Sequence, residues 1–209
     1  DGRSRRSSAG TETSLKAKDC SMNSKKHGAV NIKQVVSVDS ANLEAPSTMT
    51  ENEAFEKLES LQLENWDELK EQLKSPKWKE AKQAMQALQE ICKASPVEII
   101  TDNGEAIIVL LFSVTKSFKS SNFNLMNAAF DCILTIANAC VEHSIPFPIG
   151  TAAQFIGPCT SKFGDRKMKK KLHDMLLTVA QCATPKFVIM RVLNAARKLK
   201  SPLQIEDIL

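Results

Sequence analysis

From about residue 51 onward, apolar residues recur at intervals of three and four positions. This period is typical of amphipathic helices, which bury one stripe of side chains and leave the opposite face in water. The three longest stripes are Ala81, Met85, Leu88 and Cys92; Met126, Ala129, Ile133, Ile136 and Cys140; and Leu172, Met175, Leu176 and Val179. Few segments show the alternation of a strand, so the pattern predicts an all-α protein.

The three stripes begin in a similar way, about 45 residues apart. In each case a small polar residue of the kind that caps helices comes three positions before a large apolar residue. The pairs are Ser75 and Trp78, Ser120 and Phe123, and Asp165 and Met168, and a partial fourth copy begins at Ser201 and Pro202. Two helices in a period of about 40–47 residues are typical of HEAT solenoids. Residues 51–209 are therefore predicted to form an α-α superhelix of about three and a half HEAT repeats, incomplete at the C-terminus.

Residues at the predicted helix ends add detail. Ser75 is expected to cap a helix whose first residue is Pro76. The segment Ser95-Pro96-Val97-Glu98 has the pattern of a capping box. Gly164 is expected to end the helix before it, and residues 116–122 are expected to form a polar turn. Together these positions predict where the helices of successive repeats begin and end.

Residues 1–50 differ from the rest of the chain because they are rich in Ser, Thr and Lys and poor in large apolar residues. Such a segment cannot bury enough surface to offset the entropy lost on ordering, so it is predicted to be a disordered linker. It holds eight basic and five acidic residues, or +3 of the chain's net charge of +4. The linker is either a solvated spacer or an electrostatic tether. Residues 51–209 are nearly neutral, so local clusters must recognise any acidic partner.

The sequence lacks the residues that several classes of function require. No uninterrupted apolar run reaches the roughly 18–20 residues that span a bilayer, so no membrane partner is expected. The six cysteines form no Cys-x-x-Cys pair, and four of them fall in helical stripes, which favours free thiols in a reducing compartment. The three histidines have no cysteine or carboxylate at metal-ligand spacing, and no phosphate loop or nucleophile elbow occurs. We therefore expect no enzyme activity, metal or cofactor.

Equivalent turns of a solenoid line up along one edge, so the starts of the repeats should form one surface. Trp78 and Phe123 would place aromatic side chains beside lysines, which suits a protein partner with an acidic surface. Trp78 packed on its own repeat is the alternative, whereas Trp66 opens an apolar stripe and is expected in the core. Nucleic acid is a weaker candidate because the basic clusters are short. The candidate binding residues are Trp78, Lys79, Lys82, Asn122, Phe123, Arg166, Lys167, Lys169 and Lys200.

Five short segments follow one another between residues 52 and 209. They are Asn65-Trp66-Asp67-Glu68-Leu69, Ser75-Pro76-Lys77-Trp78-Lys79-Glu80-Ala81-Lys82-Gln83-Ala84-Met85, Lys119-Ser120-Ser121-Asn122-Phe123-Asn124-Leu125-Met126, Lys162-Phe163-Gly164-Asp165-Arg166-Lys167 and Leu199-Lys200-Ser201-Pro202. In this order and spacing they resemble a TOG domain, the tubulin-binding HEAT domain of the microtubule polymerases called chTOG or mini spindles. Residues 51–209 therefore look like part of such a domain.

The resemblance implies that the turns bind one αβ-tubulin dimer. Trp78 matches the first-turn tryptophan of the family, Phe123 the apolar residue of the second turn, and Lys167 and Lys169 the basic third turn. Two features depart from the family: the chain stops before the usual number of repeats, and Phe123 is bulky for its position. A HEAT-repeat adaptor for another acidic protein stays the alternative.

For the whole protein, the resemblance implies a microtubule-associated protein that promotes microtubule growth and organises the spindle. Its location would be the cytoplasm and the cytoskeleton, including microtubules, spindle and centrosome. The module would act as a monomer, without nucleic acid. The basic N-terminal segment resembles the linkers between TOG domains, which help to hold the microtubule lattice.

Overall fold

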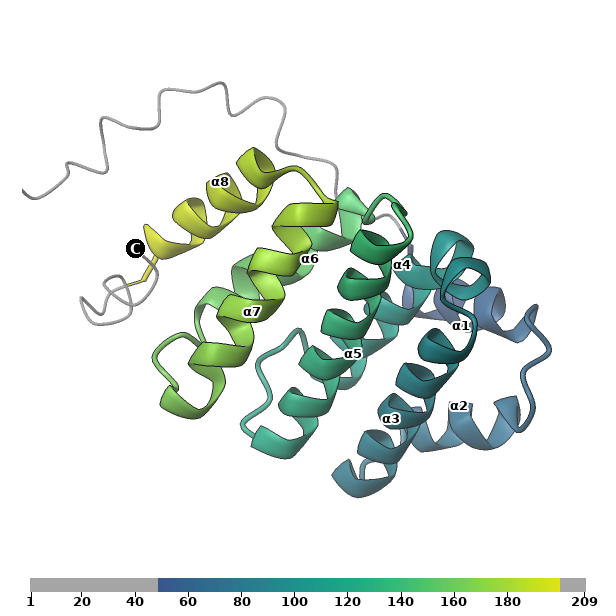
Figure 1. Ribbon diagram of the computed structural model, residues 1–209. Helices are drawn as coiled ribbons and strands as arrows, with labels where there is room; N and C mark the ends of the chain where they lie inside the picture. The colour runs from purple at the N-terminus through teal and green to yellow at the C-terminus, as the bar shows by residue number, and fades with distance from the viewer. Residues whose placement is uncertain (1–48, 200–209) are drawn as a thin grey trace, which may run out of the picture. The chain divides into compact units, whose positions relative to one another are not determined.

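The computed structural model describes residues 49–199, and within this range it contains eight α-helices and no strand (Figure 1). The helices are α1 (Glu51–Glu59), α2 (Trp66–Lys74), α3 (Trp78–Ala94), α4 (Pro96–Val114), α5 (Phe123–Glu142), α6 (Ile149–Thr160), α7 (Arg166–Cys182) and α8 (Pro185–Ala196). The prediction of an all-α protein is confirmed for these residues. The predicted linker, Lys200 and the helix expected from Pro202 lie outside the described residues.

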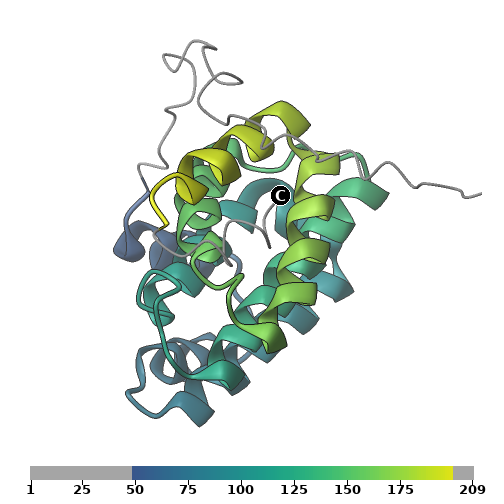
Figure 2. The same ribbon diagram turned by 90° about the vertical axis from the view of Figure 1, so that its left-hand side faces the viewer.

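The helices of residues 51–196 pack in two layers. One layer holds α3, α5 and α7 side by side, and the other holds α1, α4, α6 and α8 (Figures 1 and 2). Contacts of α3 with α4, α4 with α5, and α7 with α8 join the layers, while α2 packs mainly on α3. Because the chain alternates between layers, α3, α5 and α7 all begin at the same edge of the array.

The apolar stripes form the core between these layers. Every residue of the three long stripes is buried, as their helical spacing predicts. In α4 the run from Ala106 to Leu111 is buried nearly all round, with no residue more than 6% exposed. Trp66 is 6% exposed, and its ring centroid lies 6.2 Å from that of Phe55. The prediction that Trp66 belongs to the core is confirmed.

Helix α5 is long and apolar enough, by length and composition, to cross a membrane. The sequence prediction counted uninterrupted apolar runs, whereas α5 qualifies through the mean hydropathy of an 18-residue window. In the structure 61% of that window is buried. Its neighbours on three sides are α3, α4 and α7, so its apolar character serves the core of this array.

The start of α3 differs from the prediction. The helix begins at Trp78, with Lys77 as its N-cap, two residues after the expected start at Pro76. Ser75 instead ends α2 in an extended conformation (φ −64°, ψ 136°), the form that a following proline favours. Its Oγ accepts a hydrogen bond from the backbone N–H of Lys77 at 3.1 Å. The hydroxyl therefore holds the turn between two helices and does not cap the second one.

Two other predicted end signals differ from the structure: α4 does begin directly after Ser95, but without the capping box, and the stop at Gly164 is wrong. Ser95 precedes α4, but its backbone (φ −138°, ψ 66°) is not in the usual extended N-cap form, and its side chain makes no cap hydrogen bond. A capping box occurs at α1, where Thr50 and Glu53 each accept from the other's backbone N–H. Gly164 does not end α6, which stops at Thr160 in tight turns that bring Phe163 into the core.

The sequence predicts a polar turn between α4 and α5, but the turn contains a core residue. Phe118 is fully buried, and its ring stacks on that of Phe130 at a centroid distance of 5.6 Å. Lys116, Ser117 and Phe118 all have positive φ, between 51° and 59°. This conformation costs about 1–2 kcal/mol for a residue with a side chain, and the buried ring holds the turn in it. A single Phe among polar residues has no periodicity, so the sequence pattern missed it.

Candidate protein-binding site

Three turns lead into α3, α5 and α7 at the same end of the layer. Turn 1 comprises residues 75–77, turn 2 residues 115–122 and turn 3 residues 161–165. Since the three helices lie side by side, their N-terminal ends follow one another along the lower edge of the array in Figure 1. We call these turns, together with the first helical turns of α3, α5 and α7, the binding edge.

The same position on the edge is occupied by the first residue of each helix. The N-caps are Lys77, Asn122 and Asp165, and the first helical residues are Trp78, Phe123 and Arg166. Trp78 is 37% exposed and Phe123 39% exposed. Arg166, which is also exposed, is thus the third-turn equivalent of the two aromatic residues. The predicted equivalent, Met168, lies two residues farther along the helix and is buried in the core.

Contacts join turn 2 to turn 3, and lysines lie beside the exposed aromatic rings of the edge. The Lys167 Nζ of α7 lies 5.9 Å from the centroid of the Phe123 ring of α5. In the turns themselves, the Lys162 Nζ donates to the Ser120 backbone oxygen at 3.0 Å. At the other end of the edge, the Lys79 Nζ lies 6.0 Å from the centroid of the Trp78 ring. Both exposed aromatic rings therefore have a lysine beside them.

A groove of about 710 Å³ separates turn 1 from turn 2. Its lining includes Lys74, Ser75 and Trp78 from one side and Lys116, Lys119 and Asn122 from the other. Glu51 also lines the groove, and its carboxylate accepts a hydrogen bond from the Ser113 hydroxyl. Three of the four charged side chains that line the groove are thus basic, and the indole of Trp78 forms part of its wall.

The remaining predicted binding residues differ in their burial and hydrogen bonding. The Asn122 side chain accepts from the Leu125 backbone N–H at 3.1 Å, so its oxygen serves as the cap of α5. Lys82 and Lys169 are half-buried at the starts of α3 and α7. Lys200 lies outside the described residues. Lys74 also lines the groove but is not among the predicted residues. Its position directly before the turn at Ser75 could have indicated it.

A small hydrogen-bond network fixes turn 1. The Ser75 hydroxyl donates to the Glu80 Oε2 at 2.6 Å, and the Lys77 Nζ lies 2.9 Å from the Glu80 Oε1. The Ser75 hydroxyl, and after it the Lys77 ammonium, hold the pKa of Glu80 below its ordinary value. The Lys77–Glu80 ion pair is largely exposed and adds little stability. The network holds the backbone immediately before Trp78 and so orients the start of α3.

Charge is unevenly distributed although residues 51–209 are nearly neutral. Residues 51–74 carry eight acidic and three basic side chains, whereas residues 166–199 carry nine basic and one acidic. The N-terminal ends of α3, α5 and α7 add the partial positive charge of their helix dipoles at the edge. An acidic partner would therefore be attracted most strongly toward α7 and repelled by α1 and α2.

In residues 49–199, no group of three or more His, Cys, Asp or Glu side chains could hold a metal ion. The five cysteines of this range are all free, and four of them lie in the helical stripes from which free thiols are predicted. The expectations that the chain is not an enzyme and needs no cofactor stay predictions.

Comparison with known proteins relates the chain to a centrosomal protein. It is 26% identical over 141 residues to Centrosomal protein 224 of Dictyostelium discoideum. The match covers 68% of this chain and 7% of that protein, so the chain spans a small part of its relative's length. No family model and no solved structure matches the chain. At this identity and coverage, the match gives the chain a loose link to centrosomal and cytoskeletal proteins.

Proposed function

We propose that residues 51–209 are part of a TOG-like HEAT solenoid that binds the αβ-tubulin dimer through the binding edge. The observation that carries this proposal is the alignment of three turns at one edge. There Trp78, Phe123 and Arg166 are each the first residue of a helix in the same layer.

The helix arrangement supports the HEAT part of the proposal. In this interpretation α1 and α2 with α3 form the first repeat, α4 with α5 the second, α6 with α7 the third, and α8 begins the fourth. Alternation between two layers, in which each helix contacts the next one of its own layer, is what stacked helix pairs produce. The turns between the two helices of each pair then line up, which a binding surface on a solenoid requires.

The chemistry of the edge supports an acidic protein partner such as tubulin. Trp78 and Phe123 can each bury a large apolar area with little loss of side-chain entropy, which is typical of interface hot spots. The lysines beside them would steer the partner and fix its register. Centrosomes organise microtubules, so similarity to a centrosomal protein agrees with a cytoskeletal role.

The mechanism we propose is stoichiometric. The chain would hold a tubulin dimer near a growing microtubule end and release it as lattice contacts form. Its setting would be the cytoplasm, on microtubules, the spindle and the centrosome. A HEAT adaptor for another acidic protein would use the same edge, and the centrosomal relative is the reason to prefer tubulin.

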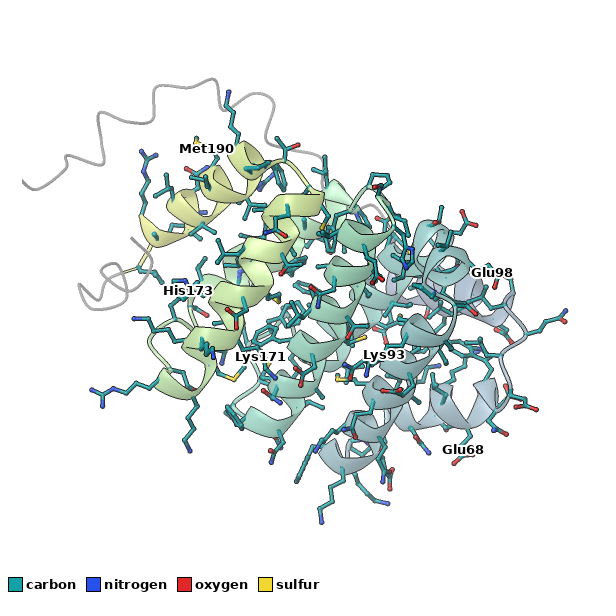
Figure 3. The ribbon with its side chains drawn as sticks, in the orientation of Figure 1. Glu68, Lys93, Glu98, Lys171, His173 and Met190 are labelled. Carbon is teal, nitrogen blue, oxygen red and sulfur yellow. The ribbon has the colours of Figure 1, made fainter. Side chains whose placement is uncertain are left out.

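Titration of unpolymerised tubulin with the chain tests the proposal. We expect a one-to-one complex that Trp78→Ala weakens strongly. Val97→Ala is the matched control, because Val97 is 52% exposed at the start of α4, at the opposite end of the helices. Its neighbour Glu98 marks this position in Figure 3. Failure of the parent chain to bind tubulin, or equal binding by Trp78→Ala, would remove the proposed function.

A further inference from the structure

Ser75 begins a Ser-Pro-Lys sequence and has basic side chains around it. It is followed by Pro76 and Lys77, and proline-directed protein kinases act on a serine before proline, favouring basic residues nearby. Ser75 is half-buried, while Pro76 and Lys77 are exposed. The extended backbone of Ser75 (φ −64°, ψ 136°) also resembles the extended form in which kinases bind their substrates.

The surroundings of Ser75 suit a phosphate group. Ser75 lines the groove between turns 1 and 2 together with Lys74, Lys116 and Lys119. Lys77 lies in the same turn, and its backbone N–H already donates to the Ser75 Oγ. A phosphoserine carries about −1.5 to −2 charges and forms one to three charge-assisted hydrogen bonds with such cations.

We propose that Ser75 is a phosphorylation site whose phosphate is held by the lysines of the groove. A proline-directed kinase transfers the γ-phosphoryl group of Mg-ATP to the Ser75 Oγ, ADP leaves, and the hydroxyl proton passes to the kinase's catalytic carboxylate. The modified turn then neutralises the basic surface that an acidic partner needs. This last consequence rests on the proposed function, whereas the phosphate site does not.

Phosphorylation also alters the network that fixes turn 1. The Ser75 hydroxyl can no longer donate to Glu80, and the phosphate repels the Glu80 carboxylate that lay 2.6 Å from the oxygen. Lys77 can then leave Glu80 for the stronger charge of the phosphate. Glu51 lines the groove, whereas Glu80 does not, and the Glu51 carboxylate accepts a hydrogen bond from the Ser113 hydroxyl of α4. The backbone before Trp78 therefore loses the hydrogen bond between Ser75 and Glu80 and gains an ion pair between the phosphate and Lys77.

The first experiment tests whether the folded chain accepts the phosphate. The full chain is incubated with a proline-directed kinase and Mg-ATP, and the site is mapped by mass spectrometry. We expect phosphate on Ser75, lost in Ser75→Ala and kept in Ser95→Ala, which removes the serine of another Ser-Pro pair. Modification of a peptide of residues 71–82 but not of the folded chain would overturn the proposal.

The second experiment tests the groove without any tubulin. A ³¹P NMR titration compares the phosphorylated chain with the phosphorylated peptide, whose second phosphate pKa is about 6. We expect a lower pKa in the folded chain, because nearby lysines favour the dianion. The double variant Lys116→Ala/Lys119→Ala should return it toward the peptide value. Equal pKa values in chain and peptide would overturn the groove as a phosphate site.

The third experiment measures the consequence for binding. The phosphorylated chain should bind unpolymerised tubulin at least about tenfold more weakly than the unmodified chain, since the groove lysines are occupied. Equal affinity of the two forms would overturn the blocking role. If the unmodified chain does not bind tubulin at all, the proposed function fails, and the ³¹P titration still decides the phosphate site.

Discussion

Trp66 and Trp78 are each the first residue of a helix and are each followed by charged residues, yet they have opposite environments. Trp66 opens α2, is 6% exposed and packs on Phe55 of α1. Trp78 opens α3, is 37% exposed and forms a wall of the basic groove. The comparison shows that the role of a large aromatic residue depends on what lies opposite its helix end. Helix α1 covers one tryptophan, and an open edge leaves the other accessible.

The largest expected effect is the loss of stability in Trp66→Ala. Removing the buried indole leaves a cavity beside Phe55, so the free energy of unfolding should fall by about 3–5 kcal/mol. Chemical denaturation measures this change. Tubulin binding should be lost only in proportion to the fraction of unfolded chain.

The second effect is the loss of binding in Trp78→Ala. Tubulin affinity should fall by about 2–4 kcal/mol, the range of an interface hot spot. The free energy of unfolding should change by less than about 1 kcal/mol, since the side chain is partly exposed in the free chain. Tubulin titration and denaturation of the same preparation measure both values. If Trp78→Ala unfolds far more easily than Trp66→Ala, the roles assigned to the two tryptophans are exchanged.

A third, smaller effect is expected from Lys167→Glu at the other end of the edge. The change reverses the charge beside the Phe123 ring, so tubulin affinity should fall about fivefold to tenfold at low salt and less at high salt. Lys93→Glu is the control, because Lys93 is exposed in the last turn of α3, away from the edge. Tubulin titrations at two ionic strengths measure the effect. Equal losses in both variants would show that overall charge, and not the edge, controls binding.

The smallest effect concerns turn 1 and pH. The pKa of Glu80 is lower in the folded chain than its ordinary value of 4.5, first because of Ser75 and then because of Lys77. The stability that this carboxylate contributes is therefore present above pH 4.5 and is lost as the pH falls through the folded pKa. Denaturation curves of the parent chain and Glu80→Gln should differ slightly at pH 7, and the difference should shrink as the pH falls below 4.5.

The sequence by itself determined the helices and their buried faces. The stripe that contains Met85, Leu88 and Cys92 is buried because exposing the apolar face of a helix to water is unfavourable in free energy. The same reasoning placed Trp66 in the core. Starts marked by local chemistry, such as the Asp165 cap of α7, were also predictable, because the cap bonds a backbone N–H two residues away.

Only the tertiary structure decided the turns and the surface they form. Phe118 is a core residue because helices α4, α5 and α6 leave a space for its ring, which no local pattern in residues 115–122 reveals. Arg166, and not Met168, joins Trp78 and Phe123 at the edge because α7 begins 43 residues after α5, whereas α5 begins 45 residues after α3. The groove with Lys74, Lys116 and Lys119 exists because two turns about 40 residues apart in sequence meet in space. Contacts between such distant segments depend on how the layers pack, and helical periodicity within one segment carries no record of them.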